Sequence, residues 1–257
     1  FPDCGYACLD ASFELLDAQA TGPMAAVITE PLFSAGGVVE PPPGWLAKLR
    51  DMAHARGMLL PLDEEQTGRA KLGTRFACEA EGVVPDIITV AKHLGGGISV
   101  SAVTTTAAIE ATVFERGFIA THSHSNDPLI CAAGIASLDV IVGEDMPAKA
   151  RAIGGRWRSH LEALAQRFEM IGDIRGRGLL QGIELVEDRM RRKPAMEAGR
   201  KIGRYCLEHG LIFSLRRGGS VLRFVPPATT TPDQIDRAAA ILGDALASVS
   251  PDGRSLT

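Results

Sequence analysis

The sequence lacks the features of a nucleic-acid-binding, membrane-spanning or disulfide-rich chain. It has no basic tract, and its 27 Lys and Arg residues are outnumbered by 31 Asp and Glu residues, for a formal net charge of −4. No apolar run approaches the roughly 18 residues of a spanning helix, and no charged-then-apolar signal segment opens the chain. The five cysteines are scattered over 257 residues, which is typical of reduced thiols in the cytoplasm. We therefore expect a cytoplasmic protein with no nucleic-acid partner and no membrane contact.

The sequence does contain an alternation of short apolar runs and helical patterns, which is typical of an α/β fold with a parallel sheet. Helices are expected over residues 6–19, 44–56, 107–116, 128–142, 145–168, 194–209 and 232–248, and strands over 24–29, 58–62, 86–91, 99–105, 178–186, 211–215 and 220–225. Beyond residue 145 the pattern changes to that of a small α+β unit. The pattern therefore predicts two domains, 1–145 and 146–257.

Three polar segments follow or precede the expected elements without an evident packing purpose: 63–68, 92–97 and 121–127. Ligands of parallel α/β sheets bind at the carboxyl ends of the strands, where loops converge. These segments therefore form the predicted site.

Lys92 follows an apolar run and precedes three glycines. An apolar approach would desolvate the amine and favour the neutral form that Schiff-base chemistry needs. The glycines would admit a flat ligand and its phosphate close to the backbone. The alternative is a surface lysine that ends a strand before a flexible turn.

Asp63 ends another apolar run, and an unpaired carboxylate at such a position would be costly without a cationic partner. A protonated pyridine nitrogen would be such a partner. The alternative is that Asp63 caps a following helix. The presence of Lys92 on a second strand end favours the cationic ligand.

Ordered motifs along the whole chain resemble the class III (subgroup II) aminotransferases of the pyridoxal-phosphate fold-type-I family. They are DEEQTG at 63–68, the lysine and GGG tail at 92–97, TEP at 29–31 with GG at 36–37, PDI at 85–87, DPL at 127–129, RGRGL at 175–179 and LRF at 222–224. Within the family, the short HSNDPL segment at 124–129 is most similar to the 2,2-dialkylglycine decarboxylase branch. The resemblance implies part of the large pyridoxal-phosphate-binding domain, followed by a small C-terminal α+β domain.

The resemblance also implies roles for individual residues. Lys92 would bind the cofactor as a Schiff base, Asp63 would keep the pyridinium nitrogen protonated, and Gln66 would donate to the phenolic oxygen. Arg223 would hold a substrate carboxylate through its bidentate fork.

A second group of implied roles belongs to the segment before the expected helix at 128–142. Ser123 would contact the cofactor phosphate in a neighbouring subunit, although Ser125 takes this place if the loop is aligned differently. Asp127, together with Ser123, matches an alkali-cation site for K⁺ or Na⁺. A phosphate contact of this kind implies at least a homodimer, or a homotetramer.

The family pattern is incomplete in two respects. Glu65 replaces a small residue, and Arg69-Ala70-Lys71 replaces the usual Gly-Arg-Thr. The phosphate cradle and the aromatic ring that stacks on the cofactor are not found before residue 63, so we expect the C-terminal part of a longer enzyme.

The leading hypothesis is decarboxylation-dependent transamination of 2,2-dialkylglycine-type amino acids with a 2-oxo acid acceptor. One alternative is an ordinary class III aminotransferase or a racemase on the same apparatus. The other is an inactive fragment, or a non-catalytic interaction surface.

Overall fold

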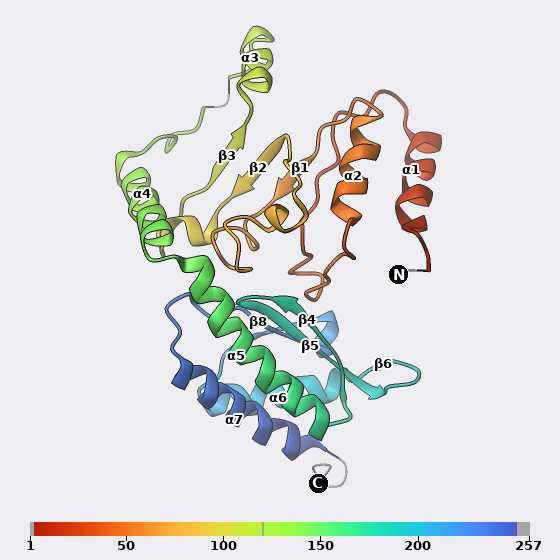
Figure 1. Cartoon of the computed structure of the whole chain (residues 1–257), viewed down its shortest axis with the longest axis vertical. Coiled ribbons are helices and arrows are strands. Elements are labelled where there is room, and N and C mark those ends of the chain that lie inside the picture. The colour runs from red at the N-terminus through yellow and green to blue at the C-terminus, as the bar shows by residue number, and fades with distance from the viewer. Residues whose placement is uncertain (1–2, 120, 251–257) are drawn as a thin grey trace. The chain divides into compact units, whose positions relative to one another are not determined.

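The computed structural model describes residues 3–119 and 121–250 (Figure 1). Two compact units are present. The first unit takes the chain up to Pro31, Pro41–Arg69 and Thr74–Glu144, and the second takes Leu32–Glu40, Ala70–Gly73 and the chain from Asp145 onward. The expected division into 1–145 and 146–257 differs from these units by one residue at the boundary and in two short segments, Leu32–Glu40 and Ala70–Gly73, which group with the C-terminal half.

The first unit is built on a three-stranded sheet in the order β1 (Pro61–Asp63), β2 (Ile87–Val90) and β3 (Ala102–Thr105). β1 and β2 are parallel, whereas β2 and β3 are antiparallel, so this sheet is mixed. The expected strand at 24–29 is reduced to two isolated parallel bridges, Ala26 to Leu59 and Thr29 to Leu62.

Two helices, α1 (Ala7–Gln19) and α2 (Trp45–His54), bury their apolar sides in this unit. Their core joins residues from both helices with residues in and before β1: Leu9, Phe13, Leu46, Leu49, Ala53, Met58, Leu60, Leu62, Cys78 and Val83. The last two come from the turn η1 (Ala77–Glu81) and from the residues after it. This packing supports β1 from one side and thereby positions its carboxyl end.

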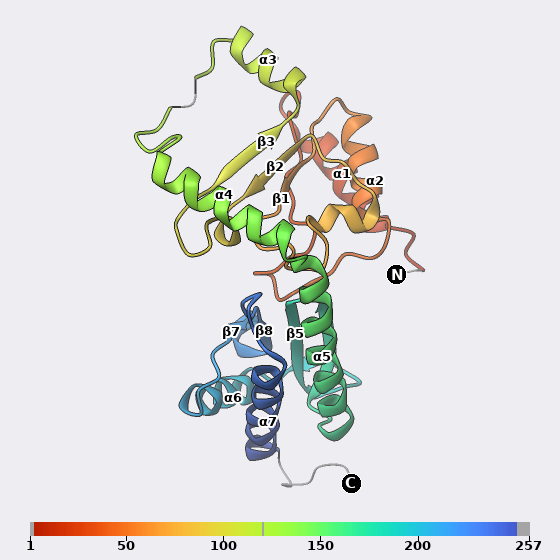
Figure 2. The same cartoon turned by 60° about the vertical axis from the view of Figure 1, so that its left-hand side comes forward.

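Two further helices, α3 (Ala107–Glu115) and α4 (Pro128–Gly143), are apolar and yet largely exposed. α3 lies beyond the end of β3 (Figure 2). In α4 Gly134 is the buried residue, while Leu129, Ile135 and Val142 are all more than half exposed. A helix that is apolar on all sides is normally buried in a folded protein. The apolar surface of α4 is therefore uncovered in this structure.

The second unit contains an antiparallel sheet in the order β4 (Ile171–Arg177), β5 (Leu180–Asp188), β8 (Val221–Phe224) and β7 (Ser214–Arg216). The two-residue strand β6 (Lys193–Pro194) pairs with β5, and the turn η3 (Arg217–Gly219) links β7 to β8. Gly178 has a φ of +53° between β4 and β5, a conformation that glycine adopts readily.

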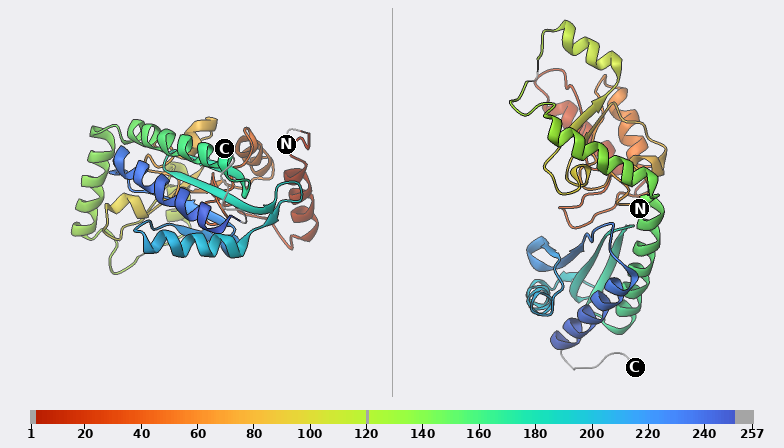
Figure 3. Two further views of the ribbon diagram at one scale, coloured as in Figure 1. Left: turned by 90° about the horizontal axis from the view of Figure 1, so that it is seen from below. Right: turned by 90° about the vertical axis from the view of Figure 1, so that its left-hand side faces the viewer.

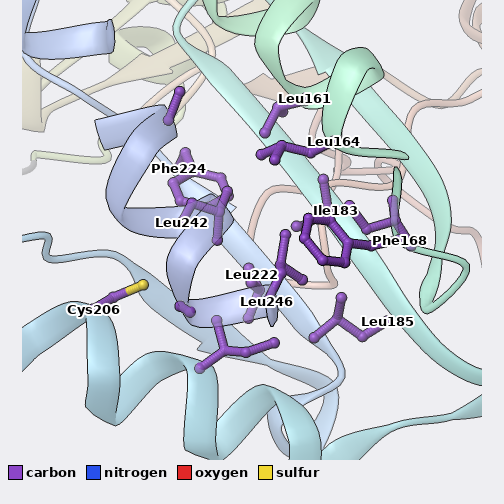
Figure 4. Packing of buried hydrophobic residues seen from close by; sticks show 14 of the residues in the cluster. Leu161, Leu164, Phe168, Ile183, Leu185, Cys206, Leu222, Phe224, Leu242 and Leu246 are labelled. Carbon is purple, nitrogen blue, oxygen red and sulfur yellow. The ribbon is translucent and has the colours of Figure 1, made fainter. Parts of the chain in front are cut away.

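The helices α5 (Met146–Arg167), α6 (Met196–Glu208) and α7 (Pro232–Val249) pack together against this sheet (Figure 3). In Figure 4, Leu161 of α5, Leu222 of β8 and Leu242 of α7 point into a common core. Trp157 meets Phe224 edge to face, with ring centroids 4.9 Å apart. Among the helices of the described residues, none has the length and hydropathy needed to cross a membrane.

Candidate active site

The carboxyl ends of β1 and β2 lie at the same edge of the sheet, because these neighbouring strands are parallel. Asp63 is the last residue of β1 and pairs in register with Thr89 of β2. Lys92 follows β2 with only Ala91 between them and begins the single turn η2 (Lys92–Gly95). The structure therefore places Asp63 and Lys92 at one edge of one sheet.

Glu65 joins these two residues. The Lys92 Nζ donates a hydrogen bond of 2.6 Å to Glu65 Oε2. The backbone N–H of Glu65 donates to Asp63 Oδ1 at 3.0 Å. An amine and two carboxylates thus form a connected group at the strand ends. The sequence identified Glu65 as a departure from the family pattern but not as the partner of Lys92.

The expected desolvation of Lys92 is wrong in this structure. The Lys92 side chain is 43% exposed and the Glu65 side chain is 36% exposed. β2 is only partly buried, and the glycine-rich turn carries the lysine out of the sheet before its side chain can be enclosed. The backbone of Lys92 is also unusual, with a φ of +49°. For a residue with a Cβ atom, this left-handed conformation costs about 1–2 kcal/mol.

The glycines after Lys92 shape a shallow hollow lined by Ala91, Lys92 and residues 97–101. A Cβ atom at Gly95 would lie 2.7 Å from Val100 Cγ1, so a larger residue would require the Val100 side chain to shift. Gly97 has a φ of +116°, which residues with a side chain rarely adopt. Position 97 therefore needs glycine for the turn beside Lys92 to form.

Glu64 has a structural role next to the site. It is fully buried, and its carboxylate accepts hydrogen bonds from the Thr67 hydroxyl and from the Cys78 backbone N–H, the latter at 2.9 Å. Burial raises the pKa of the Cys78 thiol to about 12, and the negative charge of Glu64 acts in the same direction. Glu64 thus ties the segment after β1 to η1.

Gln66 is half-buried, and its side-chain amide has no hydrogen-bond partner among the residues that the structure describes. It lies in the same turn as Glu65, after β1. An amide that already served to hold the turn together would be engaged with its neighbours. Gln66 is instead available to a ligand.

Ser123 and Asp127 lie in and next to an exposed turn before α4. Asp127 caps this helix, because its Oδ1 accepts a hydrogen bond of 3.0 Å from the Leu129 N–H. Its other oxygen lies 3.6 Å from His124 Nδ1. Within the described ranges, no hydrogen bond or ion pair joins Ser123 or Asp127 to Lys92. No group of three or more His, Cys, Asp or Glu side chains in this part of the chain is arranged to hold a metal ion.

α4 nevertheless contacts the turn that carries Lys92. Ser137 Oγ, on α4, donates to the carbonyl oxygen of His93 at 3.1 Å. The helix that Asp127 caps is therefore attached directly to η2.

Arg223 belongs to the second unit, on β8, and is 8% exposed. Its Nη1 donates to Ser34 Oγ at 2.8 Å, and its Nη2 is 3.4 Å from Ser214 Oγ. Both of these partners are neutral hydroxyl groups. Ser34 was not identified from the sequence, although it lies between the TEP and GG motifs.

Comparison with known proteins places the chain in a family. Residues 3–246 match the family model described as aminotransferase class III. The chain belongs to the class III aminotransferase family. An uncharacterized aminotransferase of Schizosaccharomyces pombe is 42% identical to it over 241 residues, which are 93% of this chain and 54% of that relative.

Solved structures of transaminases agree with this assignment. A thermostable (S)-enantioselective ω-transaminase from Thermomicrobium roseum has a TM-score of 0.86 and 30% identity, over 94% of this chain and 55% of its own. An amine transaminase from an uncultivated Pseudomonas species, in its pyridoxal-phosphate-bound form, has a TM-score of 0.87 and 29% identity, over 95% and 56% of the two chains. The similarity confirms the expected α/β fold and the expected family.

The chain spans about half the length of the relatives and solved structures it matches. The matched proteins are described as aminotransferases and transaminases. Nothing in the comparisons favours the 2,2-dialkylglycine decarboxylase branch over the rest of the family.

Proposed function

We propose that this chain carries the lysine-bearing part of a pyridoxal-phosphate-dependent aminotransferase, which moves an amino group from an amino acid or amine to a 2-oxo acid. The main support is the position of the Lys92 amine and the Asp63 carboxylate at the carboxyl ends of adjacent parallel strands. Membership of the class III family supports the same activity.

The side chains at this sheet edge fit pyridoxal phosphate in their chemistry. Lys92 offers an accessible amine for the aldehyde, Asp63 offers a carboxylate for the pyridinium nitrogen, and Gln66 offers an amide for the phenolic oxygen. When bound, the cofactor supplies an electron sink for the bond that breaks next to the amino nitrogen. Asp63 would hold the ring-nitrogen proton, and Lys92 would move a proton to and from the substrate carbon.

The remaining assignments complete the proposal. Arg223 would bind the substrate carboxylate, since a guanidinium group has a geometry suited to two parallel hydrogen bonds. Ser123 would contact the phosphate in a partner subunit, in a homodimer or homotetramer. Asp127 and Ser123 would contribute to a K⁺ or Na⁺ site.

Titration with pyridoxal phosphate tests the proposal. The wild-type chain should develop a visible absorbance band above that of the free cofactor, and Lys92→Ala should abolish it. Lys48→Ala is the matched control, because Lys48 is also a lysine in an ion pair, with a side chain that is 29% exposed. A band that persists in Lys92→Ala would exclude Lys92 as the attachment point. Absence of a band in every variant would favour the inactive-fragment alternative.

A second candidate is decarboxylation-dependent transamination of 2,2-dialkylglycines, which the HSNDPL segment at 124–129 favours. The full-length enzyme would then release carbon dioxide from 2-aminoisobutyrate in the presence of a 2-oxo acid. Amino transfer without gas release would identify an ordinary aminotransferase.

A further inference from the structure

The nitrogen atom that the proposed reaction uses is in direct contact with a carboxylate that the reaction does not require. Lys92 Nζ lies 2.6 Å from Glu65 Oε2. Lys92 must leave this contact before its lone pair can attack a carbonyl carbon. Glu65 therefore competes with any aldehyde for the amine.

Glu65 is held in place by its own backbone. Its N–H donates to Asp63 Oδ1 at 3.0 Å, so the residue is anchored to the end of β1 while its side chain reaches the turn after β2. The contact with Lys92 spans 27 positions of sequence and joins the two strand ends. Because Glu65 is attached to one strand end and Lys92 to the next, their contact restricts where the amine lies.

From this geometry we infer that Glu65 is a positioning residue that holds the Lys92 amine at the sheet edge and restrains its reaction with an aldehyde until a cofactor displaces it. The inference rests on the proposed function, because it assigns Lys92 as the reacting amine. It adds a residue that acts on the attachment step through Lys92.

Labelling with pyridoxal, which lacks the phosphate, measures the availability of the amine without requiring a phosphate site. In the labelling reaction a carbon–nitrogen double bond forms, the aldehyde oxygen leaves as water, and the ammonium proton passes to the solvent. Borohydride then donates a hydride to the carbon, and water protonates the nitrogen. Mass spectrometry of the resulting peptides gives the labelling rate at each lysine.

Lys48 provides a matched internal reference in the same unit. Its Nζ lies 2.8 Å from Asp10 Oδ1, so it forms a comparable ion pair away from the sheet edge. Glu65→Gln should raise the Lys92 labelling rate relative to that of Lys48 by roughly two- to fivefold, as expected for the loss of a partly exposed ion pair. Asp10→Asn should raise labelling at Lys48 and leave Lys92 unchanged.

Two further measurements separate positioning from a structural effect. Glu65→Asp keeps the carboxylate, so its Lys92-to-Lys48 ratio should lie below that of Glu65→Gln. Added salt should speed labelling of Lys92 in the wild type and have little effect in Glu65→Gln, because salt screens the pair.

An unchanged Lys92-to-Lys48 ratio in Glu65→Gln would overturn the inference. So would an equal rise at both lysines, since this would indicate a loosened fold. Failure of the proposed function has a different signature, namely the lack of any Lys92-dependent absorbance band with pyridoxal phosphate. The two failures are therefore distinguishable.

Discussion

Two adjacent glycines on α5 should respond in opposite directions to the same substitution. Gly154 is buried against the turn between β4 and β5, and a Cβ atom there would lie 2.2 Å from Gly178 O and 2.6 Å from Gly178 Cα. Gly155 is exposed, and a Cβ atom there would meet nothing within 4 Å. Alanine raises helix propensity at both positions, but it creates a steric contact only at position 154. Comparing the two variants therefore separates the effect of packing from that of helix propensity.

The cost of Gly154→Ala follows from the atoms that it would displace. Gln181 Nε2 donates to Gly154 O at 2.7 Å and to Gly178 O at 2.8 Å, so the helix and the turn are tied together at this point. Overpacking against backbone atoms costs roughly 1–3 kcal/mol or more, and each disturbed hydrogen bond costs about 1 kcal/mol. The higher helix propensity of alanine stabilises the folded state by about 1 kcal/mol and offsets part of this cost. We expect a net destabilisation of about 3 kcal/mol.

Gly155→Ala gains the propensity term alone and should stabilise the protein by up to about 1 kcal/mol. Urea unfolding followed by far-UV circular dichroism would measure both variants against the wild type. The midpoint for Gly154→Ala should fall, and that for Gly155→Ala should stay or rise, at a similar slope. Equal stability of the two variants would refute the close approach of α5 to the β4–β5 turn.

Three further predictions concern other buried groups. Lys71 is 4% exposed, and burial lowers its pKa from 10.5 to about 8. Between these pH values the unfolded chain binds more protons at Lys71 than the folded chain does, so the folded state gains stability as the pH rises. In urea titrations, the free energy of unfolding of the wild type should therefore rise relative to that of Lys71→Met by up to about 3 kcal/mol between pH 8 and pH 10.5. An unchanged difference would contradict this burial. Burial raises the pKa of Cys78 to about 12 and that of Cys206 to about 11. Both thiols should therefore resist a disulfide reagent at pH 8, while the exposed cysteines react. Rapid reaction of all thiols in the folded protein would contradict the burial of Cys78 and Cys206. Leu222→Ala should lower the free energy of unfolding in urea by about 3–5 kcal/mol, because Leu222 is fully buried. Met190→Ala is the control and should change it by less than about 0.5 kcal/mol, because Met190 is 94% exposed. Equal effects of the two substitutions would argue against the packing of Leu222 in the core of the second unit.

The helices were predictable because their signals are local. The pattern over 232–248 agrees with α7 (Pro232–Val249), whose start is set by a capping box between Thr231 and Gln234. The strand β4 was missed, because its sequence IGDIRGR shows no apolar alternation. Arg175 within it is accommodated by Glu184 of β5, at 2.5 Å, and this pairing depends on the hairpin. The reversed direction of β3 was likewise not visible in its local pattern.

The sequence by itself determined which side chains follow the apolar strands, and so it indicated Asp63 and Lys92 as residues of one sheet edge. Tertiary structure alone decided that Glu65 engages Lys92, that Ser34 engages Arg223 and that the lysine is exposed. The physical reason is the range of the interactions. Periodicity and capping act over a few residues, whereas burial and ion pairing depend on positions far apart in the chain that only the folded backbone brings together.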